Sequence, residues 1–116
     1  MMTIKIDWNA IAKDVEAQVI ALAEQILKEY AREATADART FLVNSKDRLT
    51  NWSVLLANSK IDQDEYQMLV RSQLDLAELH ALKQTGLAQV RIDMFINGII
   101  TILTSVVMSS AKGIAG

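Results

Sequence analysis

The sequence contains no proline and no cysteine, only four glycines and few aromatic residues (5%), although 51% of its residues are hydrophobic. Proline and glycine interrupt helices more strongly than any other residue, and aromatic residues favour strands. Their scarcity predicts an all-α chain. The absence of cysteine excludes disulfide bonds, thiolate zinc sites and thiol nucleophiles.

Neither sign of charge dominates, since the formal net charge is −2 at pH 7, the pI is near 5.3, and acidic and basic residues are interspersed. No basic surface is available to neutralise a run of phosphates, so we do not expect nucleic acid as a partner. Residues 1–10 lack the continuous apolar core of a signal peptide. We therefore expect a cytoplasmic protein, with membrane association as the alternative that an apolar segment near the C-terminus raises.

An amphipathic pattern begins at Trp8, directly after Asp7, whose side chain can cap a helix N-terminus. Apolar residues then recur mostly at steps of three and four residues, as on one face of a helix. This stripe consists of Ile11, Val15, Val19, Leu22, Ile26, Tyr30, Ala34, Ala38 and Phe41, followed by Leu49, Trp52 and Leu56. The pattern predicts one helix over residues 8–57. Its steps average about 3.75 residues, which favours nearly straight helix pairing over a heptad coiled coil.

The polar cluster 58–62 interrupts the pattern, and Asp62 with Glu65 matches the capping box that opens many helices. A second stripe follows at helical spacing. It consists of Val70, Leu74, Ala77, Ala81, Ala88, Ile92, Phe95, Ile99, Leu103 and Val106. The pattern predicts a second helix over residues 63–112, with Gly113 as its terminator.

These features predict a single domain over residues 1–116, an antiparallel helical hairpin of two arms spanning about 8–57 and 63–112. Each arm would be about 75 Å long at 1.5 Å per residue. The second arm also carries apolar residues on an adjoining face, among them Leu76, Val90 and Met94. One antiparallel partner cannot cover so wide a sector. We therefore expect a homo-oligomer that completes a four-helix or larger bundle.

Residues 94–111 form an apolar segment without a charged side chain. Its length lies at the lower edge of a membrane-spanning helix, roughly 17 to 25 residues. A polar stripe crosses it, formed by Asn97, Thr101, Thr104 and Ser105. In water such a stripe would face solvent or a closely packed neighbour, and in a bilayer it would face other helices or line a pore.

A turn near residue 60 would place residues 8–26 beside 94–112, so both segments share one environment. The first segment contains Lys13, Asp14, Glu16 and Glu24, which disfavours a simple two-span membrane protein. A soluble oligomer, a C-terminal helix that inserts alone and an oligomeric pore all remain consistent with the sequence. The residues expected at the oligomer or membrane interface are Trp8, Ile11, Val15, Val19, Leu22, Ile92, Phe95, Ile99, Leu103 and Val106.

No catalytic constellation is recognisable, because the serines and threonines lack a matching histidine and acid and no glycine-rich loop is present to bind phosphate. His80 is the only histidine and has no carboxylate three or four residues away on its helix. We expect no catalytic residue, cofactor, metal or small-molecule substrate. The sequence favours a non-enzymatic, self-associating structural or interaction module. The alternatives are a membrane-associated or pore-forming protein that uses residues 94–111, with lipid as its partner, and a carboxylate metal-binding bundle.

Overall fold

The computed structural model describes the backbone of residues 4–115 and the side chains of residues 4–111. Every regular element in this part of the chain is a helix, which confirms the predicted all-α class. The α-helices are α1 (Trp8–Ile26), α2 (Ala31–Asn44), α3 (Lys46–Ala57), α4 (Gln63–Ala77), α5 (His80–Gln84) and α6 (Gln89–Ala115), and the 3₁₀ turn η1 (Lys28–Tyr30) joins α1 to α2.

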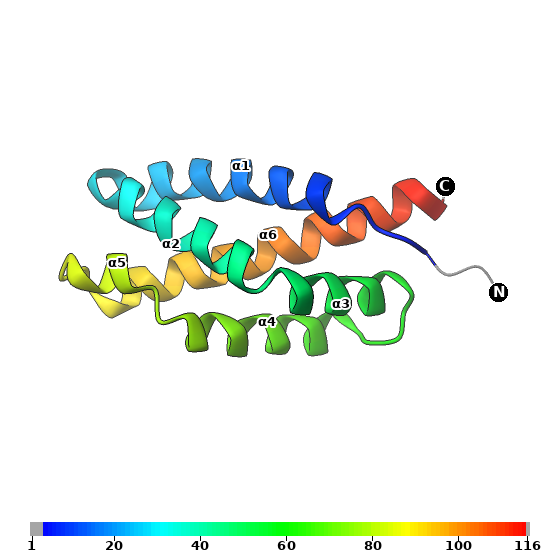
Figure 1. Ribbon diagram of the computed structural model, residues 1–116. Coiled ribbons are helices and arrows are strands. Elements are labelled where there is room, and N and C mark those ends of the chain that lie inside the picture. Colours follow the sequence, from blue (N-terminus) through cyan, green and yellow to red (C-terminus); the bar gives the residue numbers. More distant parts are fainter. Residues whose placement is uncertain (1–3, 116) are drawn as a thin grey trace.

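The helices form four antiparallel arms, namely α1, then α2 with α3, then α4 with α5, and finally α6 (Figure 1). The bundle measures 50 × 22 × 20 Å, shorter than the predicted arms of about 75 Å. Each of the two continuous helices predicted over 8–57 and 63–112 is therefore replaced by a pair of arms, and the chain reverses direction between the two arms of each pair. The four arms of one chain cover one another's apolar stripes.

The chain reverses direction between α1 and α2, at residues 27–30, where the sequence contains neither proline nor glycine. Leu27 continues the buried side of α1, because it follows Ala23 at four residues, its N–H donates to the Ala23 carbonyl at 2.9 Å, and its side chain is fully buried. The helix ends directly after it, where Lys28 takes the left-handed region at φ 42°. Arg91 of α6 satisfies the end of α1 by donating a hydrogen bond of 2.8 Å to the Ile26 carbonyl.

The chain also reverses direction between α4 and α6. It passes through two left-handed residues, Glu78 (φ 63°) and Leu79 (φ 40°), and then through Gly86 (φ 77°). The stripe predicted here contained alanines, whose small side chains bury little apolar area. The chain instead rotates so that Leu79 and Leu82 are buried. The larger apolar area of the two leucines therefore overrides the helical periodicity.

Asp37 of α2 caps the short helix α5 from the neighbouring arm. Its carboxylate accepts hydrogen bonds from the backbone N–H groups of Ala81 at 3.1 Å and Leu82 at 2.8 Å. These donors would otherwise lack a partner at the start of the helix, and a cap of this kind contributes about 1 kcal/mol. Each reversal is thus completed by one polar side chain from another arm.

Gly113 does not end the last helix, contrary to the prediction, because α6 continues to Ala115. A glycine inside a helix costs only about 1 kcal/mol relative to alanine, which a long helix tolerates.

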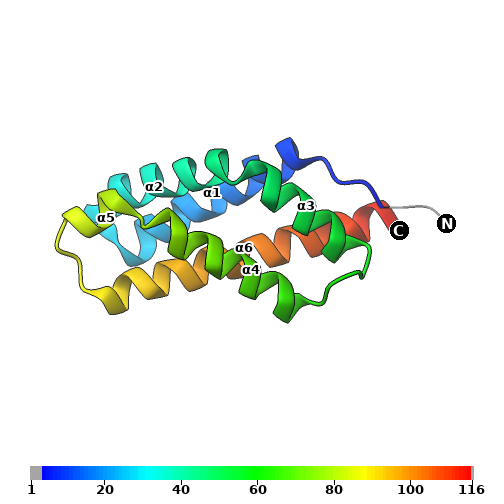
Figure 2. The ribbon, with the colours of Figure 1, turned by 60° about the horizontal axis from the view of Figure 1, so that its bottom comes forward.

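Contacts between arms keep the register of a chain that turns near residue 60. Ser53 and Tyr66 share a hydrogen bond of 2.9 Å, and Gln73 donates one of 3.2 Å to Ser45. Nearer the two termini, α1 lies against α6 (Figure 1), and Leu22 contacts the backbone at Gly98. The members of each pair lie about equally far from residue 60 along the chain. The structure is therefore an all-helical bundle of four antiparallel arms, with the reversals after α1 and before α6 at the same end of the bundle (Figure 2).

Candidate interaction surface

The residues expected at an oligomer or membrane interface lie in the core between arms of one chain. Most of them are buried: Trp8, Ile11, Val15, Val19, Ile92, Phe95, Ile99, Leu103 and Val106. Leu22 is half-buried and rests against Gly98, where its Cγ lies 3.4 Å from the place a Cβ would occupy. These side chains join α1 to the rest of the bundle, so in this folded state they are not available to a partner.

The predicted polar stripe on α6 divides into two groups. Asn97, Thr101 and Ser105 are exposed, at steps of four residues along the outer side of the helix. Thr104 is buried, and its hydroxyl donates a hydrogen bond of 2.8 Å to the Ile100 carbonyl one turn earlier. The stripe that reaches the surface is therefore uncharged, polar and made of short side chains.

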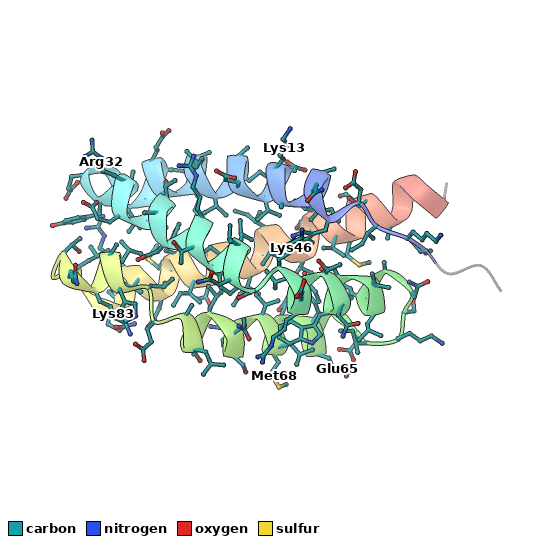
Figure 3. All side chains as sticks on the ribbon, viewed as in Figure 1. Lys13, Arg32, Lys46, Glu65, Met68 and Lys83 are labelled. Carbon is teal, nitrogen blue, oxygen red and sulfur yellow. The ribbon has the colours of Figure 1, made fainter. Side chains whose placement is uncertain are left out.

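Large apolar side chains border this stripe at the surface. Val90 and Met94 of α6 are 66% and 54% exposed, and Met68 of α4 is 66% exposed. Figure 3 shows Met68 projecting away from the bundle. Val90 and Met94 follow from the wide apolar sector seen in the sequence. Met68 was missed, because the sequence does not say which side of α4 lies beside α6.

Several grooves lie elsewhere on the surface, and two of them border residues discussed in the sequence analysis. The first, of about 450 Å³, runs between α1 and the α2–α3 arm, with Trp8, Ala12, Leu42 and Val43 among its lining residues and an Arg39–Glu16 ion pair beside them. The second, of about 350 Å³, lies between α2 and the α4–α5 arm and is lined by Asp37 and His80 among others. Both volumes fall at the small end of ligand pockets.

His80 lies at the surface with a side chain that is 74% exposed, and its Nε2 is 3.5 Å from a carboxylate oxygen of Glu78. The left-handed turn at residues 78–79 brings these neighbours together, which helical spacing did not predict. Among the described residues, no group of three or more His, Cys, Asp or Glu side chains is placed to hold a metal ion.

One helix of the described chain is long and apolar enough to cross a membrane. It is α6, over Gln89–Ala111, with a mean hydropathy of 1.7, and half of the most apolar window is buried within the bundle. A central helix in a soluble bundle satisfies the same criteria of length and composition.

Comparisons with known proteins identified no matching family, curated protein or solved structure.

Tyr66 and Ser53 form a buried polar pair between α4 and α3, and both side chains are fully buried. Burial raises the pKa of Tyr66 from 10.0 to about 12, although the hydrogen bond with Ser53 lowers it slightly. A tyrosine in the unfolded chain loses its proton near pH 10. The contribution of Tyr66 to stability is thus complete below pH 10 and is lost as the pH rises from 10 to about 12.

We predict that the Tyr30→Phe variant, in which Tyr66 is the remaining tyrosine, shows a phenolate absorbance titration with a midpoint near pH 12. The same pair predicts that the stability of the wild-type protein in urea falls between pH 10 and 12, and that the Tyr66→Phe variant loses less over this range. A phenolate midpoint at pH 10 in the folded protein would show that Tyr66 is accessible to water and would contradict the buried pair.

Proposed function

We propose that this protein is a non-enzymatic helical interaction module that self-associates through its outer surface. The observation that carries the proposal is the outer side of α6 beyond Asp93, where Met94, Asn97, Thr101 and Ser105 are exposed with no charged side chain among them. Charged side chains are depleted at the centres of protein interfaces, and methionine is enriched there. The surface of α6 has both properties.

The remaining surface is typical of a soluble bundle. Most exposed positions on α1, α2 and α4 are charged or polar, and both signs of charge occur on α1 and on α4. From Met94 onward the exposed side of α6 carries no charge and in this differs from α1 and α4, and depletion of charge is typical of the centre of an interface. An enzyme is not proposed, because the single histidine of the sequence, His80, is exposed and lies beside Glu78 at the surface.

We predict that the wild-type chain, purified without detergent, sediments with a molar mass above the 12.9 kDa of one chain, and that this mass rises with concentration across the micromolar range. Self-association through one uncharged helix surface is expected to be reversible, so dilution should release the monomer. A constant mass of 12.9 kDa at every concentration would contradict the proposal.

A second candidate function is insertion of α6 into a lipid bilayer, supported by its length and mean hydropathy of 1.7. The neighbouring helix α1 carries exposed Lys13, Asp14 and Glu24. These charges are costly in hydrocarbon, so α6 would have to leave α1 before inserting. Insertion would then require the Leu22–Gly98 contact to open.

A disulfide between α1 and α6 tests this requirement. The chain has no cysteine, so Leu22→Cys with Gly98→Cys introduces a single pair. The Cβ position of residue 98 lies 3.4 Å from Leu22 Cγ, which is near the position the sulfur of residue 22 would take and within reach of a disulfide after a small shift. If α6 inserts, the reduced double variant should float with liposomes and the oxidised one should not, whereas the Leu22→Cys single variant should float under both conditions. Equal behaviour of the two redox forms would contradict insertion by release of α6.

A further inference from the structure

The side of α4 that lies beside α6 carries an ordered set of surface residues. Asp64, Met68, Arg71 and Asp75 follow one another at steps of four, three and four residues, so they share one face of the helix, and all four are exposed. Arg71 fixes the direction of this face, because its Nη2 donates a hydrogen bond of 2.7 Å to Asn97 Oδ1 of α6. The stripe on α4 and the uncharged stripe on α6 therefore form one continuous surface.

The hydrogen bond from Arg71 also fixes the level of each residue along the bundle. The helices α4 and α6 run in opposite directions (Figure 2) and have the same rise per residue. Counted from the Arg71–Asn97 hydrogen bond, Met68 lies approximately level with Thr101, and Asp75 with Asp93. Along this face of α4 a negative side chain, Asp64, is followed by the apolar Met68 and then by the positive Arg71. This order is self-complementary when reversed about Met68.

We infer that a second copy of the chain docks antiparallel on this α4–α6 surface, about a two-fold axis that passes the level of Met68 and Thr101. This inference rests on the proposed self-association and specifies its geometry. The axis sets α4 against α4 and α6 against α6. Asp64 of each copy then faces Arg71 of the other, the two Met68 side chains lie beside each other, and Asn97 lies near Ser105 of the second copy.

Charge decides against the other two-fold arrangement of the same surface. An axis parallel to the helices would place α4 of one copy against α6 of the other at unchanged levels. Asp75 would then oppose Asp93 of the second copy, and both carboxylates are exposed. Like charges placed opposite each other across an interface cost free energy, and the uncharged part of α6 offers Asp64 no cation in return. The antiparallel arrangement removes this repulsion and creates two symmetry-related attractive pairs.

Arg71 can make the new contact without losing the old one. A guanidinium has five N–H donors, and Asn97 takes one of them. A single exposed ion pair contributes little to affinity, so the free energy of association comes mainly from burying Met68 and the short side chains of α6. The charged pairs set the register and exclude the alternative orientation.

A charge exchange tests the inference. Asp64→Arg alone and Arg71→Asp alone each place like charges opposite each other twice in the dimer, so each should raise the dissociation constant measured by sedimentation about tenfold or more. The double variant carries both substitutions and restores two opposite-charge pairs, so its dissociation constant should return to within about threefold of the wild-type value. Arg32→Asp on the exposed surface of α2 is the matched control and should leave the constant unchanged.

Met68→Lys adds an independent test at the two-fold axis. The introduced lysine would face the equivalent lysine of the second copy, and their repulsion should abolish association. Circular dichroism and urea unfolding establish that each variant is folded, which is expected because all the changed side chains are exposed. If the wild-type chain is a monomer, both the self-association and this geometry are wrong. If it associates but the double variant is no better than the single variants, or Met68→Lys has no effect, the geometry is wrong and self-association stands.

Discussion

The fold depends on covering α6, the most apolar helix of the chain, over a sector too wide for one neighbouring helix. Its buried side chains include Ile96 and Ile100 as well as Ile92, Ile99 and Leu103, so they point toward more than one neighbour. In a straight hairpin α6 would have a single antiparallel partner. Folding the hairpin across its middle brings α1, α3 and α4 around α6 within one chain (Figure 1). The apolar area thereby removed from water is the driving force for both reversals.

The reversals are stabilised by polar groups from neighbouring arms. Arg91 donates a hydrogen bond to the carbonyl at the end of α1, and N–H groups in the first turn of α5 donate hydrogen bonds to the carboxylate of Asp37. Backbone groups left without partners at a helix end would make each reversal unfavourable. The same folding turns the interface residues anticipated from the sequence inward. What remains for a partner is the side of α6 that no arm covers, together with the adjacent face of α4.

The all-α class, the turn near residue 60 and the pairing of α1 with the C-terminal segment followed from composition, the capping residues and apolar periodicity. The reversals did not, because both arms keep a helical stripe through them and the first contains no proline or glycine. In residues 63–112 the off-stripe leucines Leu79 and Leu82 mark the departure, since both are buried beyond the left-handed turn at residues 78–79. In residues 8–57 no such signal exists, because Leu27 follows the buried Ala23 at four residues, as in a regular helix. On the surface, Met68 belongs to the candidate interface because Arg71 on the same face of α4 contacts Asn97, and periodicity within one helix does not encode such a contact between arms.

The most direct test of the folded-back hairpin is the distance between spin labels on Lys13→Cys and Val43→Cys, measured by pulsed electron spin resonance in labelled protein diluted with unlabelled chain. Both positions are exposed, and the Arg39–Glu16 ion pair holds this part of α2 beside α1. The folded hairpin predicts a short distance, since packed helices lie about 8–10 Å apart at their axes. A distance of about 45 Å, as expected for these residues in one continuous helix, would contradict the fold.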